Sequence, residues 1–510
     1  MGYSRTKSVA YNAFWGCFST AFNMILSFIS RTVFIYTIGV EYLGINALYA
    51  NILGVLCFSE LGIGTAIIYS LYKPIASGSD EKIQALMGLY KTMYYYIAFI
   101  ILILGILLIP VLPHIVTTQI EVSDIIIFYS IFLFNTVSSY LFSYKYGFVY
   151  ASQKNYIISI WNSLFNILVI SAQIFALLLF REYVLYLITQ AVFQLIQKIG
   201  LNFYLNSKFP ILCKKADLPL PLEEYNKIKN NVKSLIIHKI GEVSIYQTDN
   251  IIISYFINVA AVGILSNYNL VISTISGFII IVFNSVTSSL GNLIATENKE
   301  KQYEIFEVYT FLAFWIYGCI SVCLITYFQP FITLWIGSKN CLDFVSVTLI
   351  LCNTYMVGQR LAVVNMKTAG GIFSADKYVS LVQGGLNLLI SLILVQFYGL
   401  LGIFAGTVIS GLFSSICMPW ICIRRMFPGK VWQYFKKYLY FLSVVSCTAI
   451  VSLYSVRNLN SITESWYSLT LFAVFTFLFC NLSFSVCCFR FQEFNFSVKL
   501  IKKILPFKNL

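Results

Sequence analysis

The sequence predicts an all-α polytopic membrane protein of about fourteen transmembrane helices. We expect two pseudo-symmetric six-helix lobes around a central cavity, followed by a C-terminal helix pair. Three observations lead to this fold class: long apolar runs, a one-sided distribution of positive charge and an internal repeat. Of the 510 residues, 59% are hydrophobic and only 11% are charged, which leaves no room for a soluble domain of ordinary composition.

The apolar runs are each long enough to cross a bilayer, because roughly 20 helical residues span about 30 Å of hydrocarbon. Several runs exceed this length, which predicts helices that tilt or project beyond the lipid. The first run is too long for the apolar region of a signal peptide, so we read it as an uncleaved span. We expect spans at 9–38, 42–71, 92–112, 124–150, 157–180, 183–206, 234–257, 261–290, 306–328, 344–368, 379–398, 401–423, 438–456 and 466–489.

The positive charge gathers on one side of these spans. If Met1 is cytoplasmic, only Arg181, Lys339 and Arg457 of the 34 basic residues fall in outward loops, and Arg31 falls in the outer part of the first span. This is the positive-inside distribution. It predicts a multi-pass membrane protein with both termini in the cytoplasm. The net charge of +14 then sits at the inner face, where it attracts anionic lipids, and nucleic acid is not expected as a partner.

An internal repeat relates the two halves of the chain at offsets of 218–222 residues. The matches extend over four pairs of spans, and an even number of spans per copy predicts parallel repeats related by an axis along the membrane normal. The matched positions are Tyr36, Gly44 and Tyr49 with Tyr255, Gly263 and Tyr268, then Pro110 with Pro330, Asn135 with Asn353, Lys145 with Lys367, Tyr156 with Tyr378 and Asn166 with Asn387.

The repeat and the connections predict four segments. Residues 1–206 form an N-terminal lobe and residues 234–423 form a C-terminal lobe. Between them, 207–233 is proline-containing and then charged, which predicts a cytoplasmic linker with an amphipathic segment at the membrane surface. Residues 424–510 hold the last two spans and a basic cytoplasmic tail.

Polar side chains inside spans are costly, and they commonly face a cavity. Ser19, Asn23, Ser27 and Arg31 recur every four residues, so they form one stripe that ends in a cation. Such a stripe of small polar residues also occurs on closely packed helix faces. Arg31 is too far from Met1 to anchor at the inner interface, and the alternative to a cavity position is snorkelling to the outer headgroups.

The seventh span is the richest in ionisable residues. Lys239, Glu242 and Asp249 share a face, and His238 lies four residues before Glu242. A lipid-facing stripe of this kind is too costly, so it must face protein or water. It indicates either an internal ion-pair set that supports packing or a pathway for substrate or protons. The repeat offset places Arg31 beside Asp249, which suggests a gate.

Further ionisable candidates lie in three other spans. Glu60 is a lone carboxylate in the second span. Its role is either that of a hydrogen-bonded structural group or that of a proton-coupling site. Lys145 and Lys367 are repeat-related and near the cytoplasmic ends of their spans, so they either snorkel or form a vestibule that attracts anions. Arg360 extends the face of Lys367 toward mid-membrane. The embedded bases outnumber the embedded acids, which favours an anionic substrate.

No pattern predicts a metal or an organic cofactor. Most of the 13 cysteines lie inside apolar runs and no CxxC pair occurs. Cys319 and Cys323 share a helix face and Cys487 and Cys488 are adjacent, but neither pair has His or acidic partners at metal-ligand spacing. Small buried hydrophobic side chains explain them.

The stretch RTVFIYTIGVEYLGINALYANILGVLCFSELGIGTAIIYSLYKPIA at 31–76 resembles the N-terminal signature of bacterial polysaccharide exporters, the O-antigen and capsule repeat-unit flippases. These belong to the multidrug/oligosaccharidyl-lipid/polysaccharide (MOP) exporter superfamily. YKYGFVYASQKNY (144–156) and TDNIIISYFINVAAVGILSNY (248–268) are similar to later segments of that family. The resemblance covers essentially the whole chain.

The resemblance implies a flippase that moves undecaprenyl-pyrophosphate-linked oligosaccharide repeat units from the inner to the outer leaflet by alternating access. It implies a cation-lined cavity for the pyrophosphate and sugar, and a polysaccharide polymerase and chain-length proteins as partners. It implies a location in the bacterial inner membrane, and the expected coupling ion is a proton or sodium. The candidates for the cavity are Asn23, Arg31, Lys145, Lys239, Arg360 and Lys367. The candidates for coupling or gating are Glu60, His238, Glu242 and Asp249.

Two other classes of function compete with this one. A drug or cation antiporter of the same superfamily should have a net acidic cavity, whereas the embedded charges here are net basic. A membrane-bound polysaccharide polymerase should have a large outward loop, and an acyltransferase should have a catalytic His. The expected outward loops are short, and only His114 and His238 occur in the chain.

Overall fold

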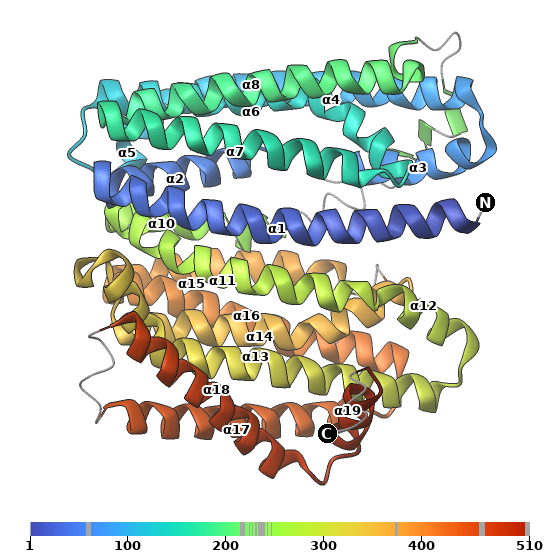
Figure 1. Ribbon diagram of the computed structural model, residues 1–510, viewed down its shortest axis with the longest axis vertical. Coiled ribbons are helices and arrows are strands. Elements are labelled where there is room, and N and C mark those ends of the chain that lie inside the picture. The colour runs from blue at the N-terminus through green and yellow to red at the C-terminus, as the bar shows by residue number, and fades with distance from the viewer. Residues whose placement is uncertain are drawn as a thin grey trace. The chain divides into compact units, whose positions relative to one another are not determined.

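The computed structural model describes residues 2–57, 63–214, 220–223, 225–226, 228–229, 232, 240–241, 243–245, 247–372, 376–457 and 465–504 (Figure 1). Within these ranges the regular elements are helical, and the chain divides into two compact units, Met1–Ser266 and Asn267–Leu510. Twelve of the described helices are long and apolar enough to cross a membrane. The prediction of an all-α polytopic membrane protein is therefore confirmed.

The two remaining predicted spans are those at 42–71 and 234–257. The first is divided between α2 (Val40–Leu56) and α3 (Ile63–Ser77), and residues 58–62 lie outside the described residues. The second lies partly outside them, and its described end forms α10 (Thr248–Phe256). Much of the predicted linker at 207–233 is likewise outside, so the predicted lobe boundary stays a prediction.

The first unit is a bundle of long helices. In Figure 1 its longest helices run nearly parallel to one another. The remaining elements of this unit are α1 (Gly2–Ile38), α4 (Asp80–Leu108), η2 (Ile109–Val111), α5 (Leu112–Ile115), α6 (Val122–Ala151), α7 (Asn155–Phe180), α8 (Tyr183–Lys208), η3 (Pro210–Cys213) and the first turns of α11 (Val259–Ser285).

Two tyrosines at the repeat offset, one in each unit, each form a hydrogen bond with the backbone near the start of a later helix. Both side chains are fully buried. The hydroxyl of Tyr49 donates to the carbonyl of Ile125 at 2.9 Å, and the hydroxyl of Tyr268 accepts from the backbone N–H of Leu342 at 3.0 Å. Tyr49 thus joins its own helix to the start of the helix that begins at Val122, and Tyr268 joins its own helix to the residues just before the helix that begins at Phe344. This correspondence agrees with the internal repeat.

The second unit packs around α13 (Lys299–Ile336), which is the most buried of its long helices. A continuous apolar core joins this helix to the four long helices that begin at Phe344, Leu400, Val431 and Trp466. The elements of this unit are the rest of α11, α12 (Thr287–Thr296), α13, η4 (Ser338–Asn340), α14 (Phe344–Ala369), α15 (Lys377–Tyr398), α16 (Leu400–Met426), α17 (Val431–Arg457), α18 (Trp466–Cys488) and α19 (Gln492–Ile504).

Small residues bring α16 into close contact with α15. A Cβ atom at Gly402 would meet the backbone of Leu394, and one at Gly406 would meet Ser391. Small residues spaced four apart allow such close approach between helices in lipid, where packing replaces the hydrophobic driving force.

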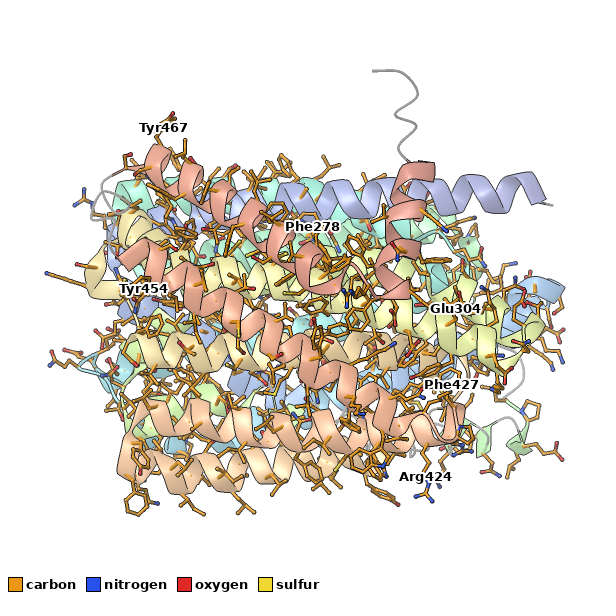
Figure 2. The ribbon with its side chains drawn as sticks, turned by 90° about the horizontal axis from the view of Figure 1, so that it is seen from below. Phe278, Glu304, Arg424, Phe427, Tyr454 and Tyr467 are labelled. Atoms are coloured by element: carbon orange, nitrogen blue, oxygen red, sulfur yellow. The ribbon has the colours of Figure 1, made fainter. Side chains whose placement is uncertain are left out.

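The two ends of the second unit differ in chemistry. Figure 2 shows Glu304, Arg424 and Phe427 toward one end of its helices and Tyr454 and Tyr467 toward the other. At the first end, ion pairs of Lys437 attach α19 to the rest of the unit. This helix lies in the predicted basic tail. Lys437 of α17 bonds Glu307 of α13 at 2.7 Å and also bonds Glu493 of α19.

Candidate functional site

Arg31 lies in the last two turns of α1, inside a membrane-spanning stretch. Its Nη1 donates to the hydroxyl of Ser266 on α11 at 2.7 Å, and that hydroxyl donates to the carbonyl of Gly263 at 2.7 Å. The phenol of Tyr186 on α8 lies within electrostatic range of the guanidinium. The cation is therefore held by polar groups from two other helices of the first unit.

Paired amides continue this polar region through the interior of the first unit. They link α1 to α7, α7 to its neighbour α8, and α6 to α8. The pairs are Asn166 Nδ2 to Asn23 Oδ1 at 3.3 Å, Gln173 Nε2 to Gln190 Oε1 at 3.3 Å, Gln197 Nε2 to Asn162 Oδ1 at 2.9 Å, and Asn135 Nδ2 to Gln194 Oε1. We call Arg31 and these amides the polar band.

The polar band exists because amides inside a membrane need partners. No water reaches the hydrocarbon, so each unpaired amide would cost several kcal/mol. On α8 the amides at 190, 194 and 197 recur at three- and four-residue intervals, which places them on one side of the helix. Their partners on α6 and α7 then complete the pairs.

Lys198 of α8 adds a second cation to the polar band. Its Nζ donates to the carbonyl of Asn135 at 2.9 Å, to the Oδ1 of Asn135 at 2.8 Å and to the hydroxyl of Ser138 at 3.1 Å. Our sequence reasoning missed this lysine, although it lies well inside the predicted span 183–206. The rule that selected Arg31, that ionisable residues within a span are significant, would have found it.

Three predicted cations are held within their own units. Lys145 is 5% exposed and donates to the Oδ1 of Asn206 on α8. Arg360 is 9% exposed and donates to the hydroxyl of Ser414 on α16. Lys367 forms an ion pair with Asp376, an acid that our sequence reasoning did not consider because it lies in a loop.

The structure brings some predicted site residues together and leaves others apart. Asn23 and Arg31 lie on one helix and belong to the polar band, whereas Arg360 and Lys367 belong to the second unit. Asp249 lies in the first turn of α10. Glu60, His238, Lys239 and Glu242 lie outside the described residues. The predicted roles of all these residues, and the suggested gate between Arg31 and Asp249, stay predictions.

The polar band is suited to a ligand with hydroxyl and phosphate groups. Side-chain amides both donate and accept hydrogen bonds, as sugar hydroxyls require. A guanidinium binds phosphate oxygens through two parallel N–H bonds. Within the part of the chain that the structure describes, no three His, Cys, Asp or Glu side chains are grouped as metal ligands.

Comparison of the sequence with known proteins finds no match, whereas comparison of the structure with solved structures finds similar folds. No family model matches the chain, and no curated protein matches its sequence. Among solved structures, the lipid II flippase MurJ in an inward closed conformation superposes with a TM-score of 0.62 at 14% identity, over 93% of this chain and 99% of that one.

Two further solved structures have similar folds. An inward-facing multidrug resistance MATE family transporter of the MOP superfamily superposes with a TM-score of 0.61 at 14% identity, covering 80% of this chain and 94% of that one. A MOP superfamily transporter from Pyrococcus furiosus gives a TM-score of 0.54 at 14% identity, covering 84% and 96%. The chain thus has the fold of MOP-superfamily transporters. At this identity the similarity establishes the fold alone.

Proposed function

We propose that the chain is a transporter, and not an enzyme, that moves undecaprenyl-pyrophosphate-linked oligosaccharide repeat units from the inner to the outer leaflet. The product would supply O-antigen, capsule or exopolysaccharide synthesis. One observation carries the proposal: within membrane-spanning helices, the first unit combines an arginine with a set of paired amides and buried phenols. Amides and phenols suit sugar hydroxyls, and the arginine suits pyrophosphate.

The transport problem explains why such a site is needed. A pyrophosphate cannot cross hydrocarbon unaided, because removing an ion from water costs far more free energy than thermal motion supplies. A polar, positively charged site replaces the lost hydration, while the lipid tail can stay in the bilayer. Alternating access would then expose the site to one leaflet at a time.

Within this proposal Arg31 and Asn23 are the foremost substrate contacts, since both belong to the polar band. Lys145, Lys239 and Lys367 are further candidates for attracting the pyrophosphate. Glu60, His238, Glu242 and Asp249 are the candidates for coupling to a proton or sodium ion. The protein would lie in the bacterial inner membrane with both termini in the cytoplasm, next to anionic lipids, a polysaccharide polymerase and chain-length proteins.

A drug or cation antiporter is the second candidate function. The observation that favours it is the structural similarity to a multidrug resistance MATE family transporter, whose TM-score nearly equals that of MurJ. An antiporter for cations would use carboxylates at its binding site, so substitution of acids would remove transport while substitution of Arg31 would not.

A flipping assay in proteoliposomes tests the proposal. The substrate is a fluorescent polyprenyl-pyrophosphate oligosaccharide, and its transfer to the far leaflet is followed with and without a pH gradient. We expect transfer by the wild-type protein and stimulation by the gradient that Glu60→Gln or Asp249→Asn abolishes. Transfer that is independent of the pH gradient would exclude a coupling role for these residues but would still support the proposed substrate.

A control panel separates the two candidate functions. The same vesicles are loaded with an organic cation and scored for its export. Absence of lipid transfer with several glycans, together with cation export, would overturn the flippase and support the antiporter.

A further inference from the structure

The second unit contains a buried polar cluster where α14, α16 and α17 meet. We call it the seam cluster. Its members are Tyr355, Gln359 and Arg360 of α14, Ser414 and Ser415 of α16, and Tyr434 and Tyr438 of α17. Six of the seven are at most 9% exposed, and Tyr438 is packed against the same core. The polar band lies in the other unit, so the seam cluster is a separate feature.

The members of the seam cluster converge on one region. Arg360 donates to the hydroxyl of Ser414. The phenols of Tyr434 and Tyr438 each lie within electrostatic range of Arg360, and both lie within range of Tyr355. The rings of Tyr434 and Tyr438 are 6.2 Å apart between centroids. Gln359 is one helical turn from Tyr355, so the two side chains extend from the same side of α14.

Several polar atoms of the seam cluster have no hydrogen-bond partner from the protein. They are Nε2 and Oε1 of Gln359 and the hydroxyls of Tyr355, Ser415 and Tyr434. Buried polar groups in native proteins are almost always paired, because an unpaired group loses its hydration without compensation. Tyr355 and Tyr434 lie near each other, Gln359 is one turn from Tyr355, and Ser415 follows the serine that bonds Arg360, so one bound partner could complete several of these bonds.

The donors and acceptors among these groups indicate which kind of ligand they would bind. Hydroxyls and amide N–H groups donate hydrogen bonds, and Oε1 of Gln359 is the only one of these atoms that solely accepts. Arg360 adds positive charge, which repels metal cations and attracts anions. Donors beside a cation, with six of the seven side chains at most 9% exposed, favour a small anion over a pyrophosphate or a sugar. We propose that the seam cluster binds one small inorganic anion of the halide class, with chloride as the natural occupant.

The bound anion would join three helices of the second unit. Its negative charge would be attracted to Arg360 of α14 while hydroxyls from α16 and α17 donate to it. The anion would therefore hold α17 against the rest of the unit. This inference gives Arg360 a role other than the predicted contact with substrate, and it stands whether or not the chain moves lipid-linked glycans.

Chloride binding is tested first on the wild-type protein. The purified protein in detergent is unfolded thermally in sodium chloride and in sodium gluconate at equal ionic strength. We expect a higher midpoint in chloride, saturating with concentration. Crystals soaked in sodium bromide should show an anomalous peak in the seam cluster. Equal midpoints in both salts and no anomalous peak would overturn the proposal and leave ordered water as the partner.

Matched variants then locate the site. Tyr434→Phe removes one hydroxyl but keeps the ring, and we expect the chloride concentration for half-maximal stabilisation to rise about tenfold, because a hydrogen bond to an anion is lost. Tyr129→Phe is the control: its hydroxyl is also buried and unpartnered, but it lies in the first unit. If both variants respond to chloride like the wild type, the seam cluster is not the site. Broadening of the ³⁵Cl resonance by wild-type protein provides a measurement that needs no variant.

Discussion

Gly44 and Gly263 lie against each other's helices in a reciprocal way. A Cβ atom at Gly44 would meet the carbonyl of Val259, and a Cβ atom at Gly263 would meet the carbonyl of Val40. Each valine is four residues before the glycine of its own helix, and the two glycines are 219 residues apart. This is the reciprocal contact expected where two copies of one motif pack around a local two-fold axis.

Gly44→Ala should destabilise the protein. The added methyl group meets backbone atoms of Val259, which cannot move aside as a side chain would, so we expect a loss of about 1–3 kcal/mol. Thermal unfolding in detergent measures it. Gly88→Ala in α4 is the matched control, because nothing lies within 4 Å of its added methyl group. An unfolding midpoint for Gly44→Ala as high as that of the control would contradict the close contact.

Asp376→Asn should destabilise the second unit strongly. The change leaves Lys367, whose side chain is 12% exposed, without its carboxylate, and breaking an ion pair with so little exposure costs up to about 3–5 kcal/mol. The double variant Lys367→Met/Asp376→Leu should recover most of this loss, because no charge then remains buried. Glu304→Gln breaks an exposed pair with Lys301 and should cost less than about 1 kcal/mol. Equal losses for Asp376→Asn and Glu304→Gln in thermal unfolding would refute the argument.

Glu493→Gln should loosen α19. The 5% exposed carboxylate of Glu493 pairs with Lys437, so losing its charge weakens the attachment of α19 to α17. Hydrogen exchange of the amides at 492–499 measures this, and we expect faster exchange there but not in α13. Glu307→Gln leaves the Lys437–Glu493 pair in place and serves as the control. Unchanged exchange in the Glu493→Gln protein would show that apolar contacts alone hold α19.

Arg31→Ala should lower glycan-lipid transfer at least tenfold, because the guanidinium is the proposed phosphate ligand and a charge-assisted hydrogen bond contributes about 1.5–3 kcal/mol. Arg31→Lys should keep part of the activity, since the charge remains but the forked geometry is lost. Arg181→Ala, which removes an exposed arginine at the end of α7, is the control. Full complementation of a flippase-null strain by normally expressed Arg31→Ala protein would exclude Arg31 from the site.

The suggested gate makes a separate prediction. If Arg31 and Asp249 act together in gating, Arg31→Ala and Asp249→Asn should have non-additive effects on transfer in a double-mutant cycle. Additive effects of the two substitutions on transfer would exclude the gate and would show that Arg31 and Asp249 act independently.

The sequence predicted the spans well because a span follows from local composition. Twelve of the fourteen predicted spans are long apolar helices in the described residues. The partners of the embedded polar residues were not predicted, because they come from distant segments. Arg31 bonds Ser266, which is 235 residues away, and Asn166 bonds Asn23 across 143 residues.

The amino-acid sequence by itself determined that the chain is an all-α membrane protein with a duplicated pattern, because water and lipid act on each apolar segment separately. Only the tertiary structure decided which polar side chains meet. Lys367 pairs with Asp376, Lys198 is held by Asn135 and Ser138, and Gln359 stays unpaired beside Arg360. These outcomes depend on how helices are rotated and packed, and packing is a property of several segments at once.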